Sequence, residues 1–196
     1  MSQIITTGWT VLDASHQALR DVVGKVEEDA WTRPTPCANW TVAQVLQHAV
    51  GDQLAYASFL TGSPLPTWDP FAPSGTLTEL PAAFLKTALD ASAAAWAAVE
   101  EGVDVPTPLP QGTMPAQRGV GACALDAAIH AWDIAMATDQ PSPLTNDLAK
   151  PLMEVALAIV EPLRTYGAYA AALPSEAGND DTATLLRYLG RRPTWA

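Results

Sequence analysis

Charged side chains are scarce in this sequence, and positive ones are the scarcest. Asp, Glu, Lys and Arg make up 16% of the 196 residues, and 10 Lys and Arg stand against 21 Asp and Glu, which gives a formal net charge of -11. A chain this acidic repels the phosphate backbone of nucleic acids and anionic membrane surfaces. We therefore expect neither a nucleic acid nor a membrane among its partners.

Long apolar runs and cysteines are also few. No apolar run approaches the ~20 residues of a membrane-spanning helix. Residues 1–5 have neither the basic region nor the apolar core of a signal peptide. The two cysteines, Cys37 and Cys123, are far apart, so we expect two free thiols in a cytoplasmic protein. Apolar residues make up 48% of the chain, which suits one compact domain spanning residues 1–196.

Helical spacing of apolar residues dominates what the sequence does contain, and no stretch alternates as a strand would. The prediction is an all-α protein, most simply a four-helix bundle with additional short helices and Pro-rich loops. Pro-rich loops are expected over 63–75 and 103–119, and Pro151 and Pro162 should kink or interrupt the fifth helix. Helices are expected over residues 4–26, 41–60, 78–101, 124–138, 145–165 and 185–190.

The second helix has the clearest start. Thr41 and Gln44 have the spacing of a capping box, in which each side chain bonds the backbone N–H of the other residue. His48 follows one turn later, and Asp52 and Tyr56 continue along its side of the helix. We expect this face to border a pocket that includes Asp52 and Tyr56.

A second polar stripe lies on the fourth helix. Asp126 and His130 are four residues apart, so they are neighbours on one helix face, and His130 leans toward Asp126. A carboxylate and an imidazole one turn apart can bind the same metal ion. Trp132 belongs to the adjacent apolar stripe and is expected in the core, where it could wall the pocket.

The chain offers few candidates for a third ligand. His48 would complete a set of two nitrogens and one oxygen with open coordination positions, which is typical of catalytic metals. Asp133 competes with Asp126 for His130, and it could instead accept a hydrogen bond that fixes the tautomer of a ligand. Asp52 is a weaker candidate for an oxygen donor, and His16 is expected to be structural. In the metal-free alternative, His130 simply bonds Asp126 or Asp133.

A different chemistry would use Cys37. This residue precedes a helix N-terminus, where the helix dipole can lower the pKa of a thiol. Cys37 would then be a nucleophile with His48 as its base. The competing interpretation is a small buried residue in a Pro-rich turn.

Two segments carry a family resemblance. Residues 34–48, PTPCANWTVAQVLQH, and residues 126–135, DAAIHAWDIA, resemble the metal-binding domain of mycothiol-dependent maleylpyruvate isomerase and its relatives. These proteins belong to the DinB-like superfamily of metal-binding four-helix bundles. The resemblance covers most of the chain and implies that His48, Asp126 and His130 bind one divalent ion, with zinc favoured over nickel or iron. It also implies mycothiol as a cofactor or co-substrate.

The chain departs from the isomerase in two respects. Asp126 stands where the isomerase has Glu, and no separate C-terminal domain is expected. Maleylpyruvate isomerisation itself is therefore not the expected reaction. We expect a thiol-dependent transferase or isomerase that acts on a small electrophile. The alternatives are a non-catalytic metal- or ligand-binding protein and a helical homodimer whose polar stripe is only structural.

Overall fold

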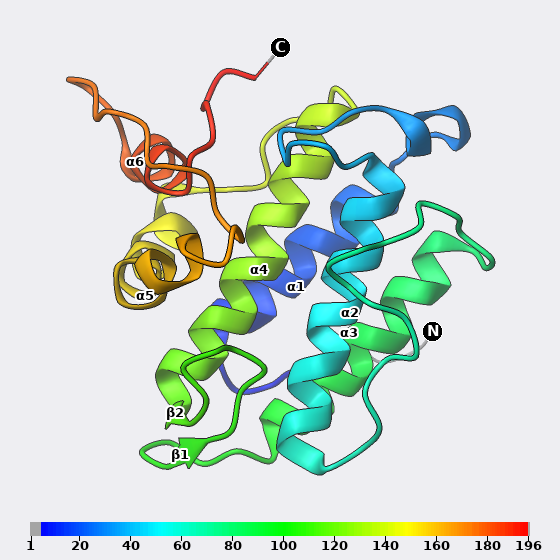
Figure 1. Ribbon diagram of the computed structural model, residues 1–196, viewed down its shortest axis with the longest axis vertical. Coiled ribbons are helices and arrows are strands. Elements are labelled where there is room, and N and C mark those ends of the chain that lie inside the picture. Colours follow the sequence, from blue (N-terminus) through cyan, green and yellow to red (C-terminus); the bar gives the residue numbers. More distant parts are fainter. Residues whose placement is uncertain (1–4, 196) are drawn as a thin grey trace.

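The computed structural model describes residues 5–195, and the described chain is almost wholly helical (Figure 1), which confirms the all-α prediction. A short 3-10 helix, η1 (Glu28–Thr32), precedes the second α-helix. Two short strands, β1 (Asp104–Val105) and β2 (Met114–Pro115), form an antiparallel pair. The helices are α1 (Thr10–Val23), α2 (Val42–Thr61), α3 (Pro81–Ala97), α4 (Ala116–Ala137), α5 (Asn146–Arg164) and α6 (Asp181–Tyr188).

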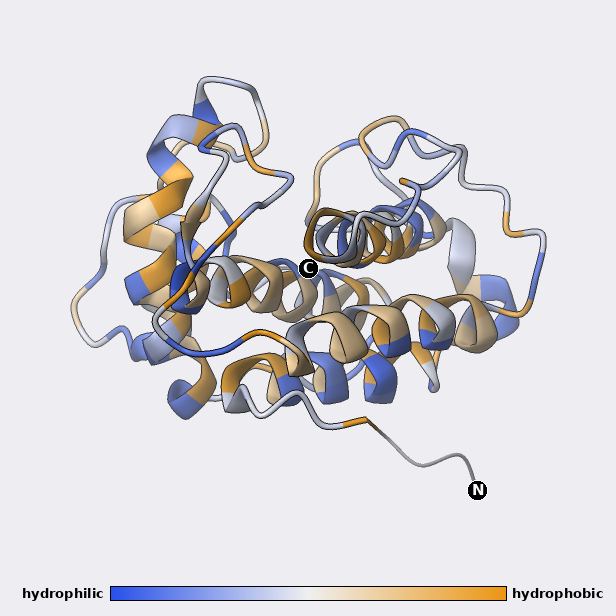
Figure 2. Ribbon diagram, turned by 90° about the horizontal axis from the view of Figure 1, so that it is seen from below, coloured by the Kyte–Doolittle hydropathy of each residue, from blue (hydrophilic) through white to orange (hydrophobic). Residues whose placement is uncertain are grey.

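Four of these helices form a bundle. α1 packs on α4 and α3, and α2 packs on α3 and α4 (Figure 1). α5 packs on α4 and α6 on α5, so the C-terminal helices lie beside the bundle. Hydrophilic residues lie mainly on the outward sides of the helices (Figure 2). The architecture is that of a DinB-like four-helix bundle with additional helices.

α4 is the central helix of the fold. Almost all of its side chains are buried, and both apolar clusters of the core include residues from it. By length and composition it could pass for a membrane span, but 89% of its most apolar window is buried against the rest of the protein. α4 is therefore a core helix, whose apolar surface is removed from water by the surrounding parts of the protein.

The start of α2 is as predicted. The Thr41 side chain accepts a hydrogen bond from the backbone N–H of Gln44, and Gln44 Oε1 accepts one from the backbone N–H of Thr41 at 2.9 Å. Gln44 Nε2 also donates to the carbonyl of Pro73 at 3.0 Å. The cap therefore joins the Pro-rich loop 62–80 to α2.

Several helix boundaries differ from the predictions. α1 begins at Thr10 and ends at Val23, inside the expected range 4–26, and residue 4 lies outside the described residues. α3 begins at Pro81, after the expected start at residue 78, and has Leu80 as its N-cap. Pro has a fixed φ that suits this position and lacks the N–H that would be unpaired there.

The predicted loop over 103–119 is wrong in its second half. α4 begins at Ala116, and β1 and β2 occupy part of the remainder. Gly121 lowers helix propensity, but a Cβ there would lie 2.5 Å from Cγ2 of Val155 on α5. The glycine thus allows α4 and α5 to approach closely.

The C-terminal helices also differ from the predictions. α5 runs from Asn146 to Arg164 with Pro151 and Pro162 inside it, so neither proline interrupts the helix, and its buried residues are spread along its whole length. α6 begins at Asp181, four residues before the expected start, and Asp180 caps it by accepting from the backbone N–H of Ala183.

Candidate metal centre

Three side chains from two helices bring their donor atoms together. Asp126 Oδ1 lies 3.4 Å from His48 Nε2 and 3.3 Å from His130 Nε2. All three atoms lie within 4.8 Å of one another. The two histidines are buried and the Asp126 side chain is 15% exposed. The structure therefore places the three sequence-predicted ligands in one cluster between α2 and α4.

The imidazole of His48 is held by the loop that follows α2. Its Nδ1 lies 2.9 Å from the carbonyl oxygen of Pro70, which can only accept, so Nδ1–H donates to it and Nε2 faces Asp126. A Cβ on Gly51 would lie 2.6 Å from Cγ of Pro70. The absent side chain of Gly51 is what lets Pro70 reach His48.

The imidazole of His130 is held by a buried ion pair. Its Nδ1 lies 3.0 Å from Asp133 Oδ2, and Asp133 receives hydrogen bonds from Arg191 Nε at 2.8 Å and from an Arg191 terminal nitrogen at 2.7 Å. Asp133 is fully buried, and Arg191 is 9% exposed. Asp133 thus fixes the His130 ring and directs Nε2 toward Asp126, the arrangement that orients histidine ligands in metal sites.

The spacing and chemistry of this cluster suit a divalent ion. Ligand atoms at about 2.0–2.2 Å from a tetrahedral zinc lie about 3.3–3.6 Å apart. The two separations from Asp126 Oδ1, 3.3 and 3.4 Å, agree with that spacing. Asp126 Oδ2 is buried without a hydrogen-bond partner among the described residues. Two imidazole nitrogens and a carboxylate form a common ligand set for zinc.

The charges of the cluster are strongly coupled. Burial opposes ionisation of Asp126, but His130 and His48 outweigh it, so the pKa of Asp126 is lowered. Burial likewise opposes protonation of His130, yet Asp126 and Asp133 raise its pKa. In the metal-free protein these shifts favour a protonated His130 paired with an ionised Asp126. A metal ion must displace this proton, so its affinity should rise with pH.

A cavity of about 660 Å³ opens onto the cluster. Asp52 and Tyr56 of α2 line it, whereas Trp132 packs in the apolar core and does not. Asp52 Oδ2 is buried without a partner among the described residues. Burial and the carboxylate of Asp126 raise the pKa of Asp52, which favours its protonated form.

The comparisons with known proteins agree with this geometry. Residues 12–135 match the model of the family described as mycothiol maleylpyruvate isomerase N-terminal domain. The chain belongs to this family. Two uncharacterised proteins of Mycobacterium tuberculosis, from strains CDC 1551 / Oshkosh and ATCC 25618 / H37Rv, are each 30% identical to it over 152 residues, which cover 76% of this chain and 79% of the relative. No solved structure matches the chain.

The match to the isomerase N-terminal domain family includes His48, Asp126, His130 and Asp133 but ends well before Arg191. The family is a metal-binding, mycothiol-related one. Arg191 lies after α6, and sequence reasoning missed it because it is 58 residues from Asp133. In the sequence, only its position directly after Gly190 marks it. Gly190 has a φ of +80°, which suits a turn after a helix.

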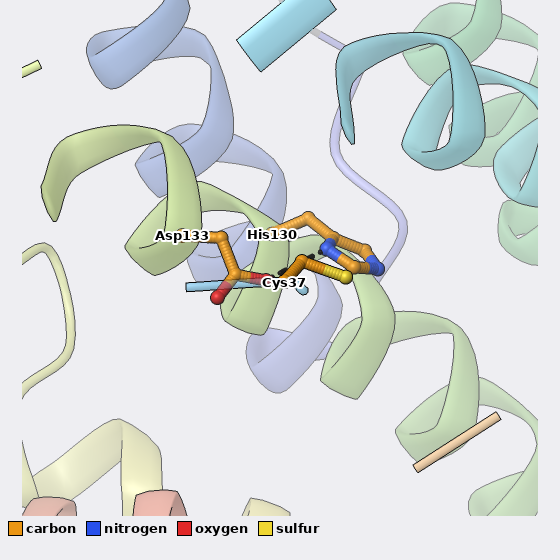
Figure 3. A group of neighbouring side chains, drawn as sticks. All are labelled: Cys37, His130 and Asp133. Atoms are coloured by element: carbon orange, nitrogen blue, oxygen red, sulfur yellow. Dashed lines mark hydrogen bonds and ion pairs between the residues drawn. The ribbon is translucent and has the colours of Figure 1, made fainter. Parts of the chain in front are cut away.

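Cys37 lies beside the candidate centre on the His130 side. Its sulfur points toward the imidazole of His130, which is joined to Asp133 (Figure 3). Cys37, His130 and Asp133 form a second group with donor atoms within 4.8 Å, but Arg191 already neutralises Asp133. Burial raises the pKa of Cys37, which is opposite to the lowering that an activated nucleophile needs.

His16 lies away from the cavity, in the core between α1 and α2. Its Nε2 lies 2.7 Å from Oε1 of Gln53, which also accepts from Ser92 Oγ at 2.9 Å. Gln53 Nε2 donates to the carbonyl of Cys123 at 3.1 Å. This network joins α1, α2, α3 and α4, so the position of His16 fits the expected structural role.

Proposed function

We propose that the protein binds one divalent ion, zinc rather than nickel or iron, through His48, Asp126 and His130, and transfers or isomerises a small electrophile with the help of a mycothiol-type thiol. The observation that carries this proposal is the convergence of three donor atoms whose partners, Pro70 and Asp133, keep both Nε2 atoms directed at one point. Membership of a mycothiol-related, metal-binding family supports the same chemistry.

The residues of the chain have distinct tasks in this proposal. A bound divalent ion would lower the pKa of the thiol and keep it as a thiolate near neutral pH. With a divalent ion bound, His48 and His130 would be neutral ligands through Nε2, each oriented by a hydrogen bond from its Nδ1–H to a fixed oxygen. The mainly apolar walls of the cavity would surround the sulfur and the electrophile. The sulfur lone pair forms the new bond to carbon, and the displaced electron pair leaves with the leaving group or, in an addition, takes up a proton.

The test is the spectrum of cobalt-substituted protein with mycothiol. We expect a sulfur-to-metal charge-transfer band near neutral pH, because thiolates bind such metals well. The band should be absent from His130→Ala and present in Cys37→Ala, since the sulfur comes from the ligand. Loss of the band in Cys37→Ala, or no effect of the thiol at millimolar concentration, would contradict the proposal.

The second candidate is a non-catalytic metal- or ligand-binding protein. It is favoured by the absence of an activated nucleophile among the described residues of the cavity, where burial raises the pKa of Cys37. A charge-transfer band without turnover of any electrophile would support it.

We also propose that residues 1–196 act as one unit in the cytoplasm, where small thiols stay reduced. Light scattering would show whether that unit is a homodimer.

A further inference from the structure

The cavity is large enough to bury a small-molecule ligand. Its volume of about 660 Å³ falls within the range of pockets that bury drug-sized ligands. α2, α4 and α5 supply its walls together with the loops 108–110 and 166–169. Away from the candidate metal ligands the walls are mainly apolar, as at Ile129, Ile159 and Leu163.

Positive charge is nearly absent from these walls. Among the described residues that line the cavity, Arg191 is the only Lys or Arg. Its charge is balanced by Asp133, which binds two of its nitrogens at 2.7 and 2.8 Å. Asp52 and Asp126 are the carboxyl groups of the lining, and Asp52 adds no positive charge whether it is protonated or ionised.

Aromatic side chains border the open side of the cavity. Phe71 and Tyr166 line it and are 70% and 72% exposed, and they belong to two loops far apart in the sequence. Trp40 also lines it, with its ring centroid 4.8 Å from that of His48. Flat apolar groups pack well against such rings, and exposed apolar side chains gathered at a cavity are typical of ligand-binding sites.

We propose that the electrophile taken by this cavity is an uncharged, largely apolar molecule, and that electrophiles bearing carboxylates are excluded. The inference rests on the proposed function and gives its substrate class. A bound divalent ion would add no unpaired positive charge to the cavity, because Asp126 and the thiolate would together offset its charge. A dicarboxylate such as maleylpyruvate would then meet two carboxyl groups and no unpaired cation, which costs it affinity in a cavity of low dielectric constant.

The test compares two unreactive aromatic compounds that differ by one carboxylate. Binding of 1,3-dinitrobenzene and of 3,5-dinitrobenzoate is followed by quenching of tryptophan fluorescence, in zinc-loaded protein saturated with mycothiol and in metal-free protein. We expect the neutral compound to bind at least about tenfold more tightly, because the cavity offers no unpaired cation to compensate the carboxylate for its lost hydration.

Two lysine variants separate the cavity lining from the overall charge of the protein. Tyr166→Lys places a cation at the mouth, whereas Leu157→Lys places one on the outer surface of α5, at a position that is 58% exposed and does not line the cavity. Both change the net charge equally. Tyr166→Lys should reduce the preference for the neutral compound several-fold, and Leu157→Lys should leave it unchanged.

Equal or tighter binding of the carboxylate, an equal effect of the two lysines, or no binding of the neutral compound would overturn the inference. These results are distinguishable from failure of the proposed function, because the cobalt and mycothiol spectrum tests the thiol without any electrophile. The comparison in metal-free protein, where Asp126 is paired with His130, decides the inference even where the thiol does not bind.

Discussion

At the residue scale, the candidate centre depends on the groups that hold its two imidazoles. The Pro70 carbonyl accepts from His48 Nδ1, and Asp133 accepts from His130 Nδ1, so both Nε2 atoms face Asp126 Oδ1. An ordinary surface pair of His and Asp has no such fixed tautomers. The two carboxylates therefore have different tasks, with Asp126 as a ligand and Asp133 as the support of one.

This division of tasks predicts unequal effects of two matched substitutions. Asp126→Asn removes the charged ligand oxygen and should weaken zinc binding the most. Asp133→Asn leaves the three donor atoms in place and should weaken it by about 10–100-fold, as is usual for a group that orients a ligand. Competition with a chromophoric chelator measures both affinities.

The same two variants need a check on folding. Asp133→Asn leaves Arg191 without its buried partner, which itself destabilises the fold. Urea unfolding of the metal-free variants separates that cost from the change in metal affinity. If Asp133→Asn weakens zinc binding more than Asp126→Asn in variants that fold, the ligand has been assigned to the wrong carboxylate.

At the element scale, local signals predicted the structure well and distant ones did not. The capping box of Thr41 and Gln44 fixed the start of α2, because its partners are three residues apart. The spacing of Asp126 and His130 likewise placed them on one face of α4. The start of α4 was predicted too late because Gly121 is a poor helix former. The presence of this glycine in the helix is explained only by the close approach of Val155 on α5.

The supports of the site could not be predicted from the sequence. Pro70 meets His48 across 22 residues of the chain, and Arg191 meets Asp133 across 58 residues. No helical or strand period connects such pairs, so only the tertiary structure shows them. Sequence spacing therefore gave the donor atoms but not the groups that orient them.

The packing of the loop 62–80 on α2 predicts an indirect effect on the site. Gly51→Ala would push Pro70 away, since the new Cβ would lie 2.6 Å from Pro70 Cγ. His48 would then lose the acceptor of its Nδ1–H, and zinc affinity should fall by about tenfold or more although no ligand has changed.

A double variant supplies the control for this prediction. Pro70→Gly removes the ring atoms that clash and keeps the carbonyl, so Gly51→Ala combined with Pro70→Gly should regain zinc affinity relative to Gly51→Ala. If Gly51→Ala binds zinc as the unmodified protein does, the loop does not position His48.

At the scale of the whole molecule, stability should depend on the buried network around His16. Burial lowers the pKa of His16 to about 4, more than its hydrogen bond to Gln53 raises it. The unfolded chain binds a proton at His16 near pH 6.5, whereas the folded protein does not. The contribution of a neutral His16 is therefore complete above pH 6.5 and is lost as the pH falls toward 4, by roughly 3 kcal/mol at most.

The comparison with His16→Gln isolates this effect. Glutamine keeps a hydrogen-bond donor but does not titrate, and Asp52, whose pKa is raised, contributes an opposite slope in both proteins. In urea unfolding of metal-free protein, the advantage of the unmodified chain over His16→Gln should shrink as the pH falls from 6.5 to 4. A difference that stays constant with pH would mean that His16 is not held neutral.

The most direct test of the central claim is the metal content of purified, untagged protein by elemental analysis. We predict about one divalent ion per chain after equilibration with zinc, because two fixed imidazoles and one carboxylate form a common zinc ligand set. His48→Ala and His130→Ala should each lose the ion, and Cys37→Ala should retain it. A chain that binds none of zinc, nickel or iron would contradict the account and leave the cluster as a structural ion pair.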